Sequence, residues 1–188
     1  MHATSDFKKG LKIMVEGQPY SIVDFQHVKP GKGNQFTRTK LRNLLSGANL
    51  ERTFKSGEKF DVPNVEYREM NFLYKDESGY NFMDPKSFDQ LNLDESVVAD
   101  SKFYLTENLP CIILIYNDRA VGVECPKSVN LKVTQTDPGF KGNTVSGTTK
   151  PATLETGHVV QVPLHIAEGD TLKVNTLTGE YVERVSLK

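Results

Sequence analysis

Lys32 is the residue whose setting most suggests chemistry. It stands between Gly31 and Gly33 in the segment Lys29–Asn34, so neither neighbour carries a side chain that could crowd its amine. Glycines permit positive φ angles and close approach of other chains, and a lysine amine is a flexible point charge that can be acylated. The segment suits phosphate contact or covalent extension of Lys32. An ordinary hairpin tip, with Pro30 and the glycines as turn residues, is the alternative reading.

Three cations follow this segment at alternate positions, Arg38, Lys40 and Arg42. In a strand, a period of two places them on one face, roughly 6 to 7 Å apart. Such a row could follow nucleic-acid phosphates, with an affinity that falls as salt rises. A solvated outer face of a sheet is the alternative.

Residues for an enzyme are not apparent. The sequence has no G-x-S-x-G elbow, phosphate-binding loop or dinucleotide fingerprint. The middle of the chain is rich in carboxylates, which we interpret as surface acids around a short helix expected over Pro85–Leu93; examples are Asp84, Asp89, Asp94 and Glu95. A small-molecule site among these acids is the enzyme-class alternative to a binding function.

Metal and cofactor ligands are also not indicated. Cys111 and Cys125 lie far apart in sequence without paired spacing, and the histidines form no H-x-x-x-H or H-E-x-x-H pattern. We therefore expect no metal site and no cofactor.

Charge is distributed unevenly along the 188 residues, although the net charge is only -1. The range 1–64 carries eight Lys and three Arg against six acids, a balance of +5, whereas 65–127 carries -6 and 128–188 is neutral. A basic first part beside an acidic middle part is what a protein needs if only one part approaches nucleic acid. No stretch approaches the roughly 20 apolar residues of a membrane span, and the polar start lacks a signal-peptide core, so we expect a cytoplasmic protein.

The hydrophobic pattern predicts an all-β fold. Apolar residues recur mostly with period two between Gly, Asn, Asp and Pro punctuation. Strands are expected over Leu11–Val15, Tyr20–Val28 and Gln35–Leu45, which makes Lys32 the tip of a long ribbon, and over Val129–Val133, which leads into an open stretch, Thr134–Lys150. So long a loop is usually functional or disordered.

Two proline-containing boundaries, near Pro63 and Pro126, divide the chain into three domains, 1–64, 65–127 and 128–188. We expect each to be a small β-barrel, the second and third of the five-stranded oligonucleotide-binding (OB) type.

The motifs resemble the bacterial elongation factor P family over essentially the whole chain. The likeness begins at Lys29-Pro30-Gly31-Lys32-Gly33 and is strong in the third part; it includes Arg38–Arg42, Glu51–Lys55, Thr136–Gly142, Lys150–Gly157, Val162-Pro163 and Thr178–Val182. This resemblance implies an L-shaped, tRNA-like arrangement of the three domains in a monomeric, non-enzymatic translation factor.

By the same resemblance, the protein would bind the ribosome and its RNA between the peptidyl and exit sites and relieve stalling at consecutive prolines. Lys32 would reach the CCA end of peptidyl-tRNA, with Pro30, Gly31 and Gly33 forming the tip loop and Lys29 and the cationic row binding tRNA or ribosomal RNA. Lys at position 32 favours the branch modified by a lysyl-tRNA-synthetase-like ligase with β-lysine; other caps and unmodified lysine stay open.

The open stretch would meet the exit-site codon of mRNA through Gly142, Asn143, Thr144, Gly147 and Lys150. The chain departs from the family at Asn143, where Asp is common, at Gln35, where a small residue often follows the tip, and at Leu177, which replaces a commonly basic residue. A generic single-stranded RNA-binding OB protein, using barrel faces without ribosome specificity, is the alternative function.

Overall fold

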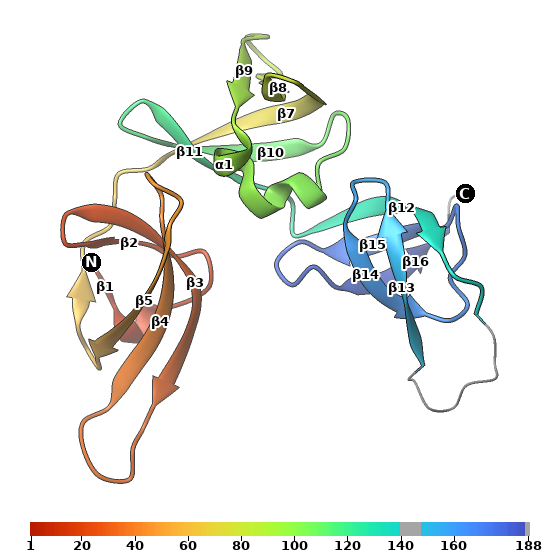
Figure 1. Cartoon of the computed structure of the whole chain (residues 1–188). Helices are drawn as coiled ribbons and strands as arrows, with labels where there is room; N and C mark the ends of the chain where they lie inside the picture. Colours follow the sequence, from red (N-terminus) through yellow and green to blue (C-terminus); the bar gives the residue numbers. More distant parts are fainter. Residues whose placement is uncertain (140–147, 187–188) are drawn as a thin grey trace. The chain divides into compact units, whose positions relative to one another are not determined.

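The computed structural model describes residues 1–139 and 148–186. In these residues strands dominate, together with one short α-helix and two 3-10 helices, so the all-β prediction is confirmed (Figure 1). The chain divides into two compact units, Met1–Tyr67 with Leu114–Gly122 and Arg68–Ile113 with Val123–Lys188.

The first unit is built on a four-stranded antiparallel sheet in the order β2-β3-β4-β5. Its strands are β2 (Lys12–Val15), β3 (Gln18–Val28), β4 (Phe36–Asn43) and β5 (Asn49–Lys55). A second, two-stranded sheet pairs β1 (His2–Ala3) with β6 (Lys59–Phe60), and a 3-10 helix, Thr4–Asp6, follows β1. The predicted β3–β4 ribbon is therefore part of a wider sheet.

Aromatic rings fill the core of the first unit where the ribbon leaves it. Phe7 contacts Phe25 and Phe54 edge-to-face at centroid distances of 6.2 and 6.1 Å, and Phe54 lies 4.6 Å from Phe60. Such pairs add packing energy beyond the area they bury. The ring of Phe25, on β3, ties the ribbon to this core, whose buried members are Phe7, Ile13, Val15, Ile22, Leu41, Phe54 and Phe60.

The middle of the chain forms a five-stranded sheet in the order β11-β10-β7-β8-β9. The strands are β7 (Glu66–Asp76), β8 (Gly79–Met83), β9 (Gln90–Leu93), β10 (Pro110–Tyr116) and β11 (Arg119–Glu124). Between β9 and β10 lie α1 (Glu95–Val98) and the 3-10 helix η2 (Ala99–Phe103).

The helix expected over Pro85–Leu93 is wrong. The Asp84 carboxylate accepts hydrogen bonds from the backbone N–H groups of Lys86 and Ser87 at 2.7 and 3.1 Å, which satisfies the turn locally. Phe88 then takes a left-handed φ of 62°, which a helix cannot continue through. The first half of the segment is thus the turn between β8 and β9, and its second half, Gln90–Leu93, is β9.

The C-terminal part forms another five-stranded sheet, in the order β14-β13-β12-β15-β16. Its strands are β12 (Ser128–Thr136), β13 (Thr149–Leu154), β14 (Val159–Pro163), β15 (Thr171–Asn175) and β16 (Tyr181–Val185). β12 runs three residues beyond the predicted Val129–Val133, and β13 begins within the stretch expected to be open. The residues between these two strands are therefore fewer than the sequence pattern indicated.

A short strap, the last residue of η2 and the one after it, Phe103-Tyr104, packs into the core of the C-terminal sheet. Tyr104 is buried in that core, and Phe103 packs against it. The Thr156 hydroxyl donates a 2.6 Å hydrogen bond to the Phe103 carbonyl, and the His158 ring lies 5.5 Å from both aromatic rings. The strap thus joins the two sheets within the second unit. The domain ranges 1–64, 65–127 and 128–188 stay a prediction.

Tyr104→Ala should destabilise the protein by about 3 kcal/mol, because it removes a buried aromatic ring from the C-terminal core. Urea unfolding of the full chain measures this. Tyr104→Phe keeps the ring and is expected to change the free energy of unfolding by less than about 1 kcal/mol. Equal stability of the alanine variant and the wild type would contradict the strap's role.

Candidate functional site at the tip of the β3–β4 hairpin

The tip of the β3–β4 hairpin is a seven-residue loop, Lys29–Gln35, whose residues are all exposed. Lys32 stands at its centre. Figure 1 shows this hairpin extending past the other strands of the first unit. The predicted position of Lys32 at the end of a ribbon agrees with this geometry.

The two glycines beside Lys32 differ in their backbone roles. Gly33 has a φ of 113°, a conformation that L-residues rarely adopt, so the turn itself requires glycine there. A Cβ added at Gly31 would meet nothing within 4 Å, and at Gly33 it would meet only the Pro30 ring at 3.9 Å. The space around Lys32 is therefore open.

The root of the loop is held by pairing and by one side-chain bond. Val28 and Phe36 form the last pair of the ribbon, and the Ser56 backbone N–H donates a 3.1 Å hydrogen bond to the Gln35 carbonyl. One step below, His27 Nδ1 lies 2.8 Å from the Thr37 hydroxyl. The ribbon is thus ordered up to the residues that flank the loop.

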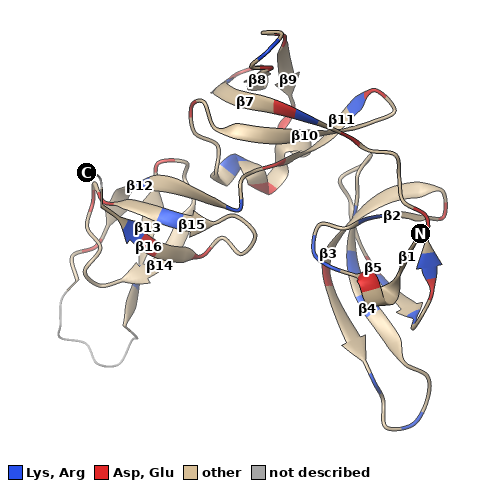
Figure 2. Ribbon diagram, turned by 180° about the vertical axis from the view of Figure 1, so that it is seen from behind, with Lys and Arg blue, Asp and Glu red and all other residues tan. Residues whose placement is uncertain are grey.

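The tip is cationic. Lys29 and Lys32 are its charged residues, and the range 29–35 contains no acid. The blue segments on this loop in Figure 2 are these lysines. Among the described residues, no hydrogen bond or ion pair is found for the Lys32 amine, so it is available to a partner.

The row Arg38, Lys40 and Arg42 does share one outward face of β4, as its period predicts. Its neighbours across the sheet differ along the row. Lys40 lies between Asp24 and Glu51, whereas Arg38 pairs with the neutral residues Gln26 and Thr53 and Arg42 with Ser21 and Asn49. Acids on both sides of Lys40 weaken its attraction for phosphate, so Arg38, which is exposed, is the strongest candidate of the row.

Arg52, another cation of the first unit, is already paired with an acid of the same unit. Its guanidinium donates two hydrogen bonds to the Glu16 carboxylate, at 2.8 and 2.9 Å, and this contact lowers the pKa of Glu16. Arg52 therefore differs from Arg38 in having an internal anion as its partner.

The second predicted site, the exit-site codon loop, lies mostly outside the described residues: Gly142, Asn143, Thr144 and Gly147 belong to the range 140–147. Lys150 is placed differently from what the sequence indicated. It lies in β13, is buried, and donates a hydrogen bond from Nζ to the Asp137 carbonyl at 2.5 Å. Its ammonium thus joins the two ends of the loop rather than facing outward.

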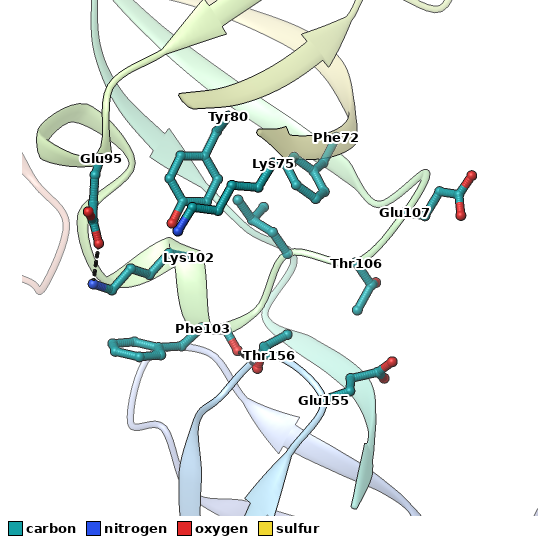
Figure 3. Close-up of a pocket in the computed structure, with 11 residues that line it drawn as sticks. Phe72, Lys75, Tyr80, Glu95, Lys102, Phe103, Thr106, Glu107, Glu155 and Thr156 are labelled. Atoms are coloured by element: carbon teal, nitrogen blue, oxygen red, sulfur yellow. Dashed lines mark hydrogen bonds and ion pairs between the residues drawn. The ribbon is translucent and has the colours of Figure 1, made fainter. Parts of the chain in front are cut away.

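A cavity in the second unit tests the enzyme-class alternative (Figure 3). Lys75 and Lys102 contact the rings of Tyr80 and Phe103, and Lys102 binds Glu95 at 2.6 Å. That contact lowers the pKa of Glu95, and backbone N–H groups lower the pKa of Asp84. A general acid at neutral pH needs a raised carboxyl pKa, and every resolved carboxyl shift in the described residues is downward.

The described residues, 1–139 and 148–186, contain no cluster of three or more His, Cys, Asp or Glu side chains placed to hold a metal ion. They also contain no helix that is both long and apolar enough to cross a membrane.

Family models cover nearly the whole chain. Residues 3–60 match the elongation factor P KOW-like domain, residues 65–123 the elongation factor P OB domain, and residues 129–184 the elongation factor P C-terminal domain. The tip loop lies in the first match and Lys150 in the third.

Curated relatives match over their full length. Elongation factor P of Bdellovibrio bacteriovorus is 68% identical over 188 residues, which is 100% of both chains. Elongation factor P of Moorella thermoacetica is 51% identical over 184 residues, covering 98% of this chain and 100% of the relative.

Among solved structures, a eukaryotic translation initiation factor 5A from Methanococcus jannaschii matches with a TM-score of 0.41 and 22% identity, over 66% of this chain and 92% of that one. A likeness this weak carries no argument. The three family models and the full-length relatives suffice: the chain belongs to the elongation factor P family of translation elongation factors.

Proposed function

We propose that this translation factor binds the ribosome between the peptidyl and exit sites and speeds peptide-bond formation at consecutive prolines. In this proposal Lys32 reaches the CCA end of peptidyl-tRNA. The observation that carries it is the setting of Lys32, an exposed amine at the centre of an acid-free loop on a paired ribbon. A slim cationic probe of this kind suits a narrow site walled by RNA phosphates.

The mechanism is positioning rather than chemistry by the factor. Proline limits the geometries available for attack because its ring fixes φ. Holding the tRNA end in a reactive pose lowers the entropic part of the barrier, while the ribosome carries out the reaction. The ordered ribbon root, from the His27–Thr37 contact to the Val28–Phe36 pair, gives the amine a firm base for this task.

Covalent extension of Lys32 fits the same geometry. Open space around Gly31 and Gly33 leaves the amine accessible to a lysyl-tRNA-synthetase-like ligase. Transfer of a β-lysyl group would move the terminal positive charge farther from the backbone. Lys29 and Arg38 would then contact phosphates along the approach to the tip, and Pro30 would shape the loop.

The exit-site codon loop remains part of the proposal, with a changed role for Lys150. Its Nζ–Asp137 bond spans the two ends of the loop, and a Cβ at Gly139 would collide with the Leu164 carbonyl. We assign Lys150 to holding the loop's root, and RNA contact to residues such as Asn143.

Lys32→Ala should slow synthesis across Pro-Pro-Pro codons by at least about tenfold in a cell lacking the native factor, since the positioning group is lost. A translation reporter with and without the proline codons measures this. Lys32→Arg keeps the positive charge but not the acylatable amine, so it separates charge from modification.

Lys59→Ala is the matched control for this experiment, because it removes an exposed lysine from β6 of the same unit, away from the tip loop. It should leave the reporter unchanged. Normal reporter output from Lys32→Ala would sink the proposal. Tight binding to isolated single-stranded RNA, undiminished in that variant, would favour the generic RNA-binding alternative.

Arg38→Gln should reduce the slope of log affinity for ribosomes against log salt concentration by about 0.7 to 0.9, the value of one phosphate contact. Arg52→Gln changes the net charge equally, but Arg52 is bound to Glu16, so its slope should stay near that of the wild type. Sedimentation with ribosomes at several salt concentrations measures both. Equal slopes for the two variants would refute a phosphate contact at Arg38.

Lys150→Met should speed amide hydrogen exchange in the segment Thr136–Gly139 about fivefold, since a bond worth about 1 kcal/mol is lost. Lys173→Met, which removes a partly exposed lysine paired with Glu183, should leave that segment unchanged. Amide hydrogen exchange followed by mass spectrometry measures the rate in both variants. Unaltered exchange in Lys150→Met would show that the loop's root does not depend on this bond.

A further inference from the structure

Cys111 and Cys125 lie far apart in sequence but meet in the fold. β10 and β11 are neighbours in one sheet, joined by the two-residue turn Asn117-Asp118. Cys111 is the second residue of β10, and Cys125 follows the last residue of β11, so the hairpin brings the chain back beside its start. The two thiols are close enough for each to shift the pKa of the other.

The surroundings of the two sulfur atoms differ. Cys111 is only 2% exposed, and its Sγ lies 3.6 Å from the Leu109 carbonyl. Cys125 is partly exposed, and its Sγ lies 3.9 Å from the Ser101 carbonyl. Cys125 is therefore the more accessible residue of the pair.

The pair is also asymmetric in acidity. The contact with Cys111 lowers the pKa of Cys125, whereas the contact with Cys125 and burial raise the pKa of Cys111. When one proton leaves, the Cys125 sulfur carries the charge and the Cys111 thiol donates to it. The thiolate is the reactive form of cysteine, so the more accessible residue, Cys125, also carries the more acidic thiol.

We propose that Cys111 and Cys125 form a dithiol site that hydroperoxides oxidise to an intramolecular disulfide. The Cys125 thiolate attacks one peroxide oxygen, the O–O bond breaks, and a sulfenic acid forms on Cys125 as the other oxygen leaves and takes up a proton. The Cys111 thiol then attacks that sulfur, the S–O bond breaks, and water leaves. Two thiols lose two electrons and two protons, and one hydrogen peroxide becomes two waters.

The disulfide would bind two parts of the second unit covalently. Cys111 belongs to the sheet of the middle part, while Cys125 packs against the core of the C-terminal sheet, the same core that the strap residues Phe103 and Tyr104 join. The Ser101 hydroxyl holds the same region by a 2.9 Å bond to the Val123 carbonyl. Oxidation would thus fasten the start of β10 to the segment that leads into β12.

The test uses the reduced full chain and hydrogen peroxide. The expected product is a monomer about 2 Da lighter, with one disulfide between the peptides of Cys111 and Cys125, reversed by dithiothreitol. Iodoacetamide should label Cys125 of the untreated chain at least about tenfold faster than Cys111. Thiols that stay reduced in excess peroxide, a disulfide between two chains, or faster labelling of Cys111 would each overturn the proposal.

Two variants separate the roles of the sulfurs. Cys111→Ser should stop at a sulfenic acid on Cys125 that dimedone traps, and Cys125→Ser should leave Cys111 unoxidised under the same conditions. Thermal unfolding followed by circular dichroism confirms that each variant is folded, and the labelling order of the wild-type chain decides if one is not. Rapid oxidation of Cys111 in folded Cys125→Ser would contradict the assignment.

Discussion

The pairing of β4 with strands on both sides is the constraint on which the tip depends. An isolated two-stranded ribbon is only marginally stable in water, and three or more strands are needed. β5 is this third strand, paired with β4 from Arg42–Asn49 up to Phe36–Lys55. An exposed, charged loop can therefore be carried at the end of β3 and β4, because the third strand stabilises the ribbon as far as the loop.

Two buried threonines of β4 lie beside the aromatic core, Thr39 opposite Phe25 and Thr37 opposite Phe54. Thr37 and Thr39 are 1% and 0% exposed, yet buried hydroxyls without partners are costly. His27 lies at hydrogen-bonding distance from Thr37, and the Thr39 hydroxyl donates to the Thr37 carbonyl at 3.4 Å. β-branched threonines suit a strand, so these positions combine strand stability with satisfied hydrogen bonds.

Local patterns in the sequence predicted what local geometry determines. The period of two predicted the outward row of β4, and the conformational freedom of glycine predicted the turn at Gly33. The sequence did not reveal which residues pair across the strands, so the acids beside Lys40 were not predicted. The helix expected over Pro85–Leu93 failed because Phe88 takes a left-handed φ of 62° and Gln90–Leu93 pairs with β8, although Asp84 caps the turn as it would cap a helix. Two features of the sequence do carry such information: Lys150 shares a period-two row with Ala152 and Leu154, and Cys111 and Cys125 flank the turn residues Asn117-Asp118 at six and seven residues.

An ordered ribbon below the exposed loop lowers the entropic cost of binding. Ordering one residue's backbone costs about 1–2 kcal/mol, and that loss would fall on the binding step if the ribbon itself were flexible. Pairing up to Val28 and Phe36 confines the remaining freedom to Lys29–Gln35 and the long side chain of Lys32. Gly33 adds to this freedom and so raises the entropic cost of binding. It is needed nevertheless, because the turn requires a φ of 113° at this position. Replacing either flanking glycine with a larger residue would stiffen the loop but crowd the amine that has to enter the site.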